Sequence, residues 1–261
     1  MSVAAAPAEN AVRGRTALVT GAGNGLGRAM AMALAAHGAH VILVGRTLER
    51  LSAVADEIDA PARVAVCDTS SAEQVAALGR ELSDAEVSIL VNNAGIAGPV
   101  APLTDIEVDE WDEVFAVNVR GVFLMCRQFL PRMTARGRGD IVNVASVSGK
   151  RPLARRTPYT ASKMAVIGLT TTLAHEVGPA GVMVNTLSPG PVDGPRMRRN
   201  FALEAARSGI SVAAAEEEFV ARSALRRMVT EAEVAAALIA MLHMPGLCGA
   251  DIDLSAGMVA R

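Results

Sequence analysis

The only tyrosine of this chain, Tyr159, stands four residues before Lys163, one of only two lysines. Arginine occupies nearly all other basic positions, so a retained lysine indicates a task that needs a compact ammonium group. On a helix, residues four apart lie on one face. An ammonium group beside a phenol stabilises the phenolate and lowers the pKa of the phenol. The spacing therefore predicts a tyrosine that acts as a general acid or base.

A glycine-rich segment, residues 20–27, follows a short run of β-type residues and precedes an alanine-rich helical pattern. Glycines allow the backbone to turn tightly and to approach a pyrophosphate, and the helix N-terminus offers free N–H groups to the anion. Its glycines alternate, which differs from the common GxGxxG pattern. The segment predicts a dinucleotide-binding turn formed by Gly21, Asn24, Gly25, Leu26 and Gly27.

The second expected strand ends in Gly45, Arg46 and Thr47. Many dinucleotide-binding folds have an acidic residue here that holds the ribose 2′-hydroxyl of NAD. A guanidinium and a hydroxyl group fit a 2′-phosphate instead, which favours NADP. The alternative is that Arg46 faces solvent and the cofactor is NAD.

Polar or small residues also follow the later strands. Asp68 is placed to meet the adenine amino group, and Asn92, Ala94 and Gly95 permit close contact with a cofactor. Ser146 follows the fifth strand. Each of them singly is compatible with ordinary turn chemistry. Together they predict that polar and small residues line one edge of a sheet.

The elements that position these residues alternate along the chain. Almost entirely apolar runs indicate strands covered on both faces. We expect strands at 16–20, 41–44, 63–67, 89–91, 141–144, 182–187 and 252–254, and helices at 25–36, 48–58, 71–82, 119–136 and 159–177. Repeated units of this kind predict the α/β class, with one doubly wound parallel sheet of Rossmann type.

No Pro-, Gly- or Ser-rich linker divides the chain. We expect a flexible tail over residues 1–13 and a single domain over residues 14–261. The stretch after the sixth strand contains prolines and a polar helical piece, and ligands bind at that edge of such sheets. It predicts a mobile helical lid over about residues 190–228. An ordinary surface hairpin of helices is the alternative.

Composition narrows the class of protein. The net charge of −2 gives no general attraction to nucleic acid or to an anionic membrane. Cys67, Cys126 and Cys248 are expected to be reduced and buried, which suits the cytoplasm. Neither the cysteines nor the dispersed histidines have the spacing of a metal site. No apolar run is long enough for a membrane-spanning helix, and the N-terminus does not read as a secretory signal.

These motifs, in this order, resemble the short-chain dehydrogenase/reductase family, in the shorter single-domain form similar to bacterial 3-oxoacyl-carrier-protein reductases. The resemblance runs from about Arg15 to about Gly257. It is carried by the turn at residues 20–27, Asn-Asn-Ala-Gly at residues 92–95, Asn118, Ser146, Tyr-x-x-x-Lys at residues 159–163, and the Pro189-Gly190 pair.

The resemblance implies a role for each matching residue. Tyr159 exchanges a proton with the substrate oxygen, and Ser146 bonds that oxygen. Lys163 binds the nicotinamide ribose, and Asn118 holds a water that connects Lys163 to solvent. The backbone of Val192 bonds the carboxamide, although Gly194 stands where the family usually has a threonine.

The expected protein is therefore an NADP(H)-dependent oxidoreductase acting on a small ketone or secondary alcohol. The resemblance also implies a homotetramer built through helices 119–136 and 159–177 and the last strand. The alternatives are an NAD-dependent alcohol dehydrogenase and a redox sensor that binds the cofactor without turnover. Arg151, Arg155 and Arg156 lie between Ser146 and Tyr159. They either attract an anionic substrate or are solvated or interface arginines.

Overall fold

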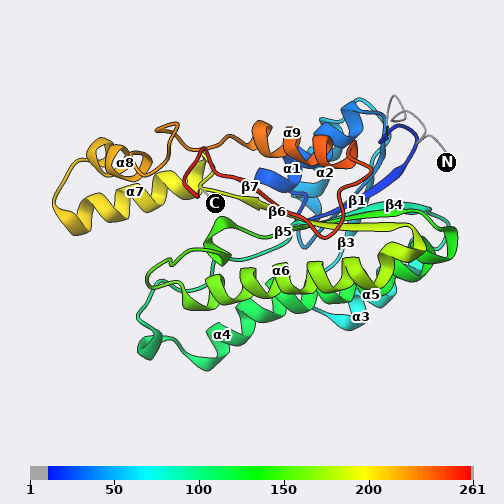
Figure 1. The fold of residues 1–261 in the computed structure, drawn as a ribbon, viewed down its shortest axis with the longest axis horizontal. Coiled ribbons are helices and arrows are strands. Elements are labelled where there is room, and N and C mark those ends of the chain that lie inside the picture. Colours follow the sequence, from blue (N-terminus) through cyan, green and yellow to red (C-terminus); the bar gives the residue numbers. More distant parts are fainter. Residues whose placement is uncertain (1–10, 260–261) are drawn as a thin grey trace.

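Short runs of aliphatic and β-branched residues form a seven-stranded sheet in the order β3-β2-β1-β4-β5-β6-β7 (Figure 1). The structure, a computed structural model, describes residues 11–259. Every strand pair is parallel. The strands are β1 (Thr16–Thr20), β2 (His40–Gly45), β3 (Arg63–Val66), β4 (Val87–Asn92), β5 (Gly139–Val144), β6 (Val182–Pro189) and β7 (Asp251–Leu254). The chain order reverses between β1 and β4, which opens a crevice at their carboxyl ends.

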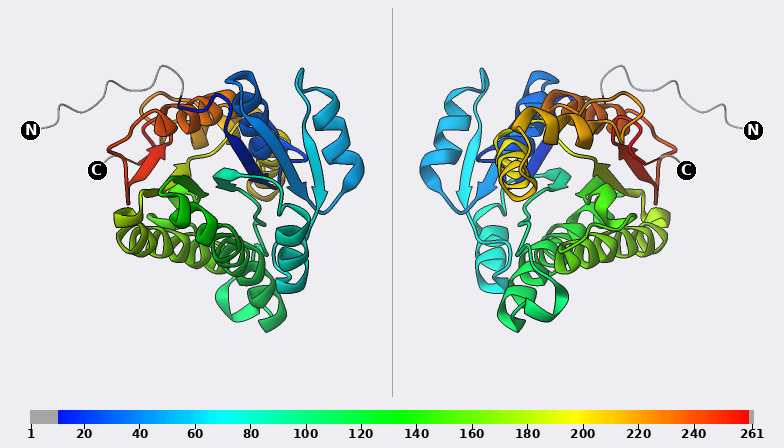
Figure 2. Two further views of the ribbon diagram at one scale, coloured as in Figure 1. Left: turned by 90° about the vertical axis from the view of Figure 1, so that its right-hand side faces the viewer. Right: turned by 90° about the vertical axis from the view of Figure 1, so that its left-hand side faces the viewer.

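Helices cover both faces of the sheet (Figures 1 and 2). One face carries α1 (Gly25–Ala36), α2 (Leu48–Asp56) and α9 (Glu231–Leu242). The other carries α3 (Ala72–Glu81), α5 (Gly121–Arg136) and α6 (Thr157–Val177). A separate apolar core fills each interface between sheet and helices. The expected α/β fold of Rossmann type is confirmed.

The strands differ in burial according to their place in the sheet. β4 is buried along its whole length, as expected for a strand covered on both faces. The edge strands β3 and β7 are only partly buried, and Val66 is exposed. An edge strand has a neighbour on one side only, so its residues are less completely covered.

Two helices were not expected from the sequence. The first, α4 (Val108–Phe115), carries four acidic residues and a Glu107–Glu110 capping box. It continues through a π-helical turn, Ala116–Arg120, into α5. The second, α9, packs closely on α1. The near-uniform apolar sequence of α9 hides the helical period on which the expectations relied, whereas α4 is amphipathic and was missed although its sequence carries that period.

The segment expected to form a lid contains two helices, α7 (Pro195–Ser208) and α8 (Val212–Val220). They pack on each other and extend away from the sheet, beyond the ends of the strands (Figure 1). Their own small core consists of Met197, Phe201 and Met228, with Phe219 packed against it.

Two expectations from the sequence need correction. The expected tail included Val12, but this residue is fully buried in the core beside α1 and α9. Residues 1–10 of that tail lie outside the described residues. Cys248 is exposed, whereas Cys67 and Cys126 are buried as expected, and all three are free thiols. Within residues 11–259, no helix is long and apolar enough to cross a membrane.

Candidate active site

The glycine-rich turn connects β1 to α1 at the crevice. Gly21 and Gly25 both have positive φ, of 65° and 54°, which glycine adopts without strain. A Cβ on Gly21 would lie 2.9 Å from Nδ2 of Asn93. Asn24 precedes α1 in an extended conformation and its side chain does not cap the helix. The first N–H groups of α1 therefore remain available to an anion.

Gly27 differs from the other glycines of the turn. It does not line the groove described below, which corrects its expected contact with a cofactor. It is fully buried, and a Cβ there would collide with the carbonyl oxygen of Gly21. Gly27 is needed because the helix must pack closely under the turn.

Thr20 and Asn93 hold the turn against the end of β4. The Thr20 hydroxyl accepts hydrogen bonds from the backbone N–H groups of Asn93 and Ala94, at 2.9 and 3.0 Å. Asn93 Nδ2 donates to the carbonyl oxygens of Thr20 and Gly21, at 3.0 and 3.3 Å. Sequence reasoning had assigned Asn92 to the cofactor and had given Thr20 and Asn93 no role of their own, although both belong to the motifs at residues 20–27 and 92–95.

Asn92 in fact lies behind the site. Its side chain is buried and donates to Oδ1 of Asn143 at 2.9 Å. Successive side chains of a strand point to opposite faces, so only one of two adjacent asparagines can face the crevice. That alternation indicates that the two asparagines differ in orientation, but it does not indicate which of them faces the crevice.

The turn opens onto a groove of about 660 Å³ along the carboxyl ends of the strands. Most of the predicted site residues line it. They are Gly21, Asn24, Gly25, Leu26, Arg46, Asp68, Ala94, Gly95, Ser146, Tyr159, Lys163, Pro189, Gly190 and Val192. Residues expected to bind a dinucleotide and residues expected to do chemistry therefore share one cavity.

Tyr159 and Lys163 both lie near the start of α6 and face this groove. The Lys163 ammonium group lies 5.8 Å from the centre of the Tyr159 ring. Lys163 is buried, and its Nζ donates to the carbonyl oxygen of Val144 at 2.9 Å. That bond comes from the end of β5, so the strand fixes the ammonium group relative to the phenol.

Ser146 lies two residues after the end of β5 and is also buried. Its hydroxyl accepts a hydrogen bond from the N–H of Ser148 at 3.1 Å. The hydroxyl proton is thus left to donate elsewhere, for example to a substrate oxygen.

Asn118 lies in the π-helical turn between α4 and α5 and is completely buried. Its side chain makes two bonds to the backbone of Ile96, at 2.8 and 2.9 Å, and donates to the Ser162 hydroxyl at 3.0 Å. The adjacent Val117, rather than Asn118, lines the groove. Asn118 Oδ1 and Lys163 Nζ nevertheless both border Gly95, since they lie 3.1 and 3.5 Å from the point where a Cβ on that glycine would be.

The opposite end of the groove carries charge. Arg46 is exposed and follows Gly45, which also lines the groove. Burial by itself would raise the pKa of Asp68, but hydrogen bonds from Ser70 and the charges of Arg46 and Arg120 hold that pKa below its usual value. Thr47 is exposed as the residue before α2 and is not among the groove residues, contrary to expectation.

The groove also contains a carboxylate that sequence reasoning missed. Glu231 opens α9 and lines the groove beside Gly25 and Gly194. Its Oε1 lies 3.7 and 3.9 Å from the points where Cβ atoms on these two glycines would be. The proximity arises from the packing of α9 on α1, which nothing in the local sequence indicates.

The groove fits a nicotinamide dinucleotide. Its turn has no room for a side chain at Gly21, the N–H groups of α1 face it, and small residues line its centre. In residues 11–259, no group of three or more His, Cys, Asp or Glu side chains is arranged to hold a metal ion.

Comparisons with known proteins agree with this geometry. A short chain dehydrogenase family model matches residues 15–205. D-threitol dehydrogenase of Mycolicibacterium smegmatis is 38% identical over 197 residues, covering 70% of this chain and 75% of that protein.

Two solved structures share the fold along most of both chains. NAD+-bound xylitol dehydrogenase is 30% identical with a TM-score of 0.86, covering 94% of this chain and 99% of its own. A variant of actinorhodin polyketide ketoreductase with NADPH is 31% identical with a TM-score of 0.87, covering 94% and 97%. With the motifs in one groove and a family model over most of its length, the chain belongs to the short-chain dehydrogenase/reductase family of NAD(P)-dependent oxidoreductases.

Proposed function

We propose that this protein transfers a hydride between NADP(H) and a ketone or secondary alcohol, with Tyr159 as the general acid/base. The observation that carries the proposal is the shared groove, in which Ser146, Tyr159 and Lys163 meet the glycine-rich turn. A nicotinamide cofactor, when bound, supplies or accepts the hydride. The residues that would hold it are those of the turn and of the strand ends that line the groove.

Tyr159 and Ser146 act on the substrate oxygen. Reduction of a carbonyl leaves negative charge on that oxygen, which needs a positioned proton donor. Tyr159 gives the proton in reduction and takes it back in oxidation. Ser146, with its hydroxyl oxygen already bonded by the N–H of Ser148, donates to the same oxygen and orients the carbonyl.

Lys163 stabilises negative charge on the Tyr159 oxygen and binds the ribose hydroxyl groups of the cofactor. The bond from its Nζ to the carbonyl oxygen of Val144 holds the ammonium group in place for both tasks.

Asn118 acts as a positioning residue. It bonds the Ser162 hydroxyl, which in turn donates to the carbonyl oxygen of Tyr159 at 2.8 Å. Asn118 thereby connects the π-helical turn to the first part of α6. We extend to it the proton relay implied by the family resemblance, because Asn118 Oδ1 and Lys163 Nζ both border Gly95.

The preference for NADP is proposed from Arg46. An exposed guanidinium at the end of β2, with Gly45 in place of a carboxylate, suits a 2′-phosphate. Asp68 is then left to meet the adenine amino group.

We further propose a homotetramer in the cytoplasm. Phe123 of α5 and Met164 of α6 are 47% and 48% exposed, which supports association through these helices. Free thiols, including the exposed Cys248, suit a reducing compartment.

Replacing Tyr159 with phenylalanine tests the proposed chemistry. The Y159F variant loses the proton donor but keeps the ring, so kcat should fall about 100- to 10,000-fold, the usual contribution of general acid–base catalysis. Turnover is followed by nicotinamide absorbance with a panel of ketones and secondary alcohols. Cofactor binding, measured by fluorescence of the reduced nicotinamide, should be retained. A variant with near-normal kcat would overturn the assignment.

A further inference from the structure

Lys150 is one of the two lysines of this chain, and the proposed chemistry uses only the other. It directly follows the turn Val147–Gly149, four residues after Ser146. Its side chain is only 5% exposed, and its ammonium group forms ion pairs with two carboxylates of β7, Asp251 at 2.7 Å and Asp253. Desolvation offsets much of the attraction in such a cluster, which points to a role other than stability.

The turn between Ser146 and Lys150 is short and closed by hydrogen bonds. The N–H of Ser148 donates to the Ser146 hydroxyl at 3.1 Å, and the N–H of Gly149 donates to the Ser146 carbonyl oxygen at 2.9 Å. The N–H of Lys150 donates to the carbonyl oxygen of Val147 at 3.0 Å. A displacement of Lys150 would therefore reach the Ser146 hydroxyl through a single turn of chain.

Gly149 brings this turn into direct contact with α6. A Cβ on Gly149 would lie 3.0 Å from the carbonyl carbon of Lys163 and 3.0 Å from the backbone nitrogen of Met164. A side chain at this position would therefore press on the helix that carries Tyr159 and Lys163. The seating of the turn on α6 sets how the Ser146 hydroxyl lies relative to the Tyr159 phenol.

The two carboxylates that hold Lys150 are themselves fixed in position. The Ser188 hydroxyl of β6 donates to Oδ1 of Asp251 at 2.6 Å, and the other oxygen of this carboxylate faces Lys150. Asp251 and Asp253 are two residues apart on one strand, so their side chains lie on the same face. A compact ammonium group can donate to both of them, which explains a lysine in a chain that otherwise uses arginine.

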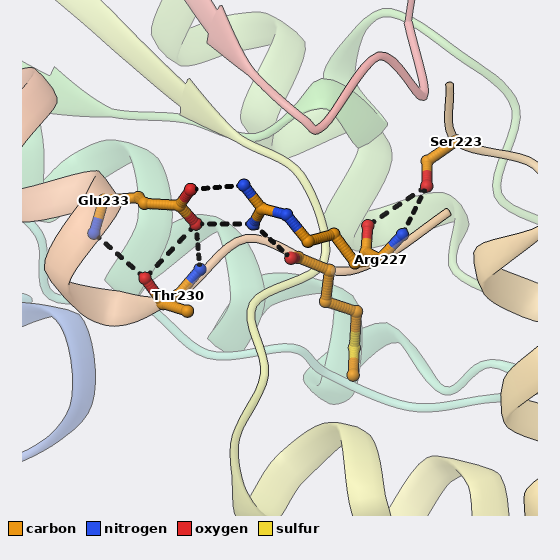
Figure 3. A network of polar contacts seen from close by, with 5 residues as sticks. Ser223, Arg227, Thr230 and Glu233 are labelled. Carbon is orange, nitrogen blue, oxygen red and sulfur yellow. Dashed lines mark hydrogen bonds and ion pairs between the residues drawn. The ribbon is translucent and has the colours of Figure 1, made fainter. Parts of the chain in front are cut away.

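The chain at the end of β7 is attached to the groove and to the base of the lid. The N–H of Gly190, a groove residue, donates to the carbonyl oxygen of Leu254 at 2.7 Å. The N–H of Leu225 donates to the carbonyl oxygen of Ala256 at 3.0 Å. The segment around Leu225 is held by a polar network (Figure 3) that consists of Ser223, Arg227, Thr230 and Glu233. The carboxylates of β7 are thus part of a firmly attached region.

We propose that Lys150 is a positioning residue, which holds the turn after Ser146 against β7 so that Ser146 and Tyr159 meet the same substrate oxygen. Lys150 is not among the groove residues, so it acts through Ser146. The inference rests on the function proposed above and adds a residue to its catalytic arrangement. The alternative is an ion pair that only stabilises the fold.

Hydrogen–deuterium exchange of the K150M variant tests the positioning without depending on turnover. Methionine keeps a side chain of similar length but removes the ammonium group. The amide hydrogens of residues 147–150 should exchange about 10-fold faster or more, while those of β1 and α1 should be unchanged. Unchanged exchange of residues 147–150 would overturn the proposal.

A double-mutant cycle with Ser146 separates positioning from stability. Reduction is followed with NADPH and whichever of butanone, cyclohexanone and ethyl 3-oxobutanoate the unsubstituted protein reduces fastest. K150M should lower kcat about 10- to 100-fold, because a small misplacement of a catalytic group has an effect of this size. In the S146A background, K150M should change kcat by less than about two-fold, because the hydroxyl that it positions is absent. An equal loss in both backgrounds would show a role in stability alone.

Two further variants complete the cycle. D253N removes one of the two ion pairs from a side chain that is 25% exposed, and it should fold even if K150M does not. It should show the same dependence on Ser146 with a smaller loss of kcat. R63M is the matched control, because Arg63 of the opposite edge strand, β3, also pairs with two carboxylates. An R63M variant with the same losses as K150M would contradict the proposal.

The two proposals fail in different ways. If S146A and Y159F lose activity but K150M keeps normal kcat and normal exchange, only the role of Lys150 is refuted. If S146A keeps near-normal kcat, the role of Ser146 in the proposed function is refuted, and the role of Lys150 is refuted with it.

Discussion

Arg46 and Glu231 are single residues that set the charge of the groove at different places. Arg46 lies at the end of β2, and Glu231 lies beside the glycine-rich turn. The first is expected to discriminate between cofactors, because only NADP has a 2′-phosphate. The second is expected to act equally on both cofactors, because the pyrophosphate is common to them.

Exchange of Arg46 for aspartate should reverse the cofactor preference. Loss of a charge-assisted hydrogen bond to a phosphate costs about 1.5–3 kcal/mol, so the NADP/NAD ratio of kcat/KM should fall about 10- to 100-fold. Steady-state kinetics with both cofactors measure this ratio. R50D changes an exposed arginine of α2 that is not among the groove residues and is the matched control. An unchanged ratio in R46D would show that Arg46 does not contact the cofactor.

Exchange of Glu231 for glutamine should tighten cofactor binding. The carboxylate stands beside Gly25, where the N–H groups of α1 are expected to receive the pyrophosphate, and like charges repel. At a solvated site the repulsion is about 1 kcal/mol, so the Kd of both cofactors should fall about three- to ten-fold. Fluorescence titration measures Kd, with E113Q on α4 as a control of equal charge change. Weaker binding in E231Q would instead indicate that Glu231 accepts a hydrogen bond from the cofactor.

At the scale of elements, the start of α9 connects the sheet to the lid. Thr230 and Glu233 form a capping box, and Arg227 pairs with the same carboxylate. The hydrogen bonds from Arg227 and Thr230 lower the pKa of Glu233 from 4.5 to about 2. Because the folded-state pKa is depressed, the stabilisation is present above the unfolded-state pKa and is lost as the pH falls toward 2.

The depressed pKa of Glu233 predicts how the stability of the E233Q variant, relative to the unsubstituted protein, depends on pH. Its melting temperature should lie below that of the unchanged protein near pH 6, and the difference should shrink as the pH falls to about 3. The effect should be small because the pair is exposed and screened by solvent. E217Q, on exposed α8, is the control in thermal unfolding by circular dichroism. A difference that grew on acidification would contradict the assigned ion pair.

At the scale of the whole molecule, association should bury α5 and α6. Light scattering should give a mass of about four chains of 27.0 kDa. Replacing both Phe123 and Met164 with glutamate would place charges in an apolar interface, so the variant should form dimers or monomers instead of tetramers. The control L203E alters a 64% exposed leucine of α7 and should leave the mass unchanged. If the protein without substitutions were a monomer, the proposed tetramer would be refuted.

Much of the fold was predictable because its signals are local. The bounds of β1 and α1 were predicted as they are found, since an apolar strand, a glycine turn and an alanine-rich helix follow one another directly. The helix that carries Tyr159 and Lys163 was predicted to within a few residues. These features depend on residues within a turn or two of each other.

Other features were not predictable because they depend on contacts between distant segments. The π-helical turn that buries Asn118 is held by Ile96 and Ser162, which lie 22 and 44 residues away. Val12 belongs to the core only because α1 and α9 pack beside it.

The sequence by itself determined the fold class, the glycine-rich turn and the pairing of a phenol with an ammonium group, because spacing along a helix or strand sets which side chains share a face. Only the tertiary structure decided that Asn93 rather than Asn92 faces the groove, and that Glu231 borders it. Such neighbours are chosen by the packing of whole elements, and no short stretch of sequence contains that information.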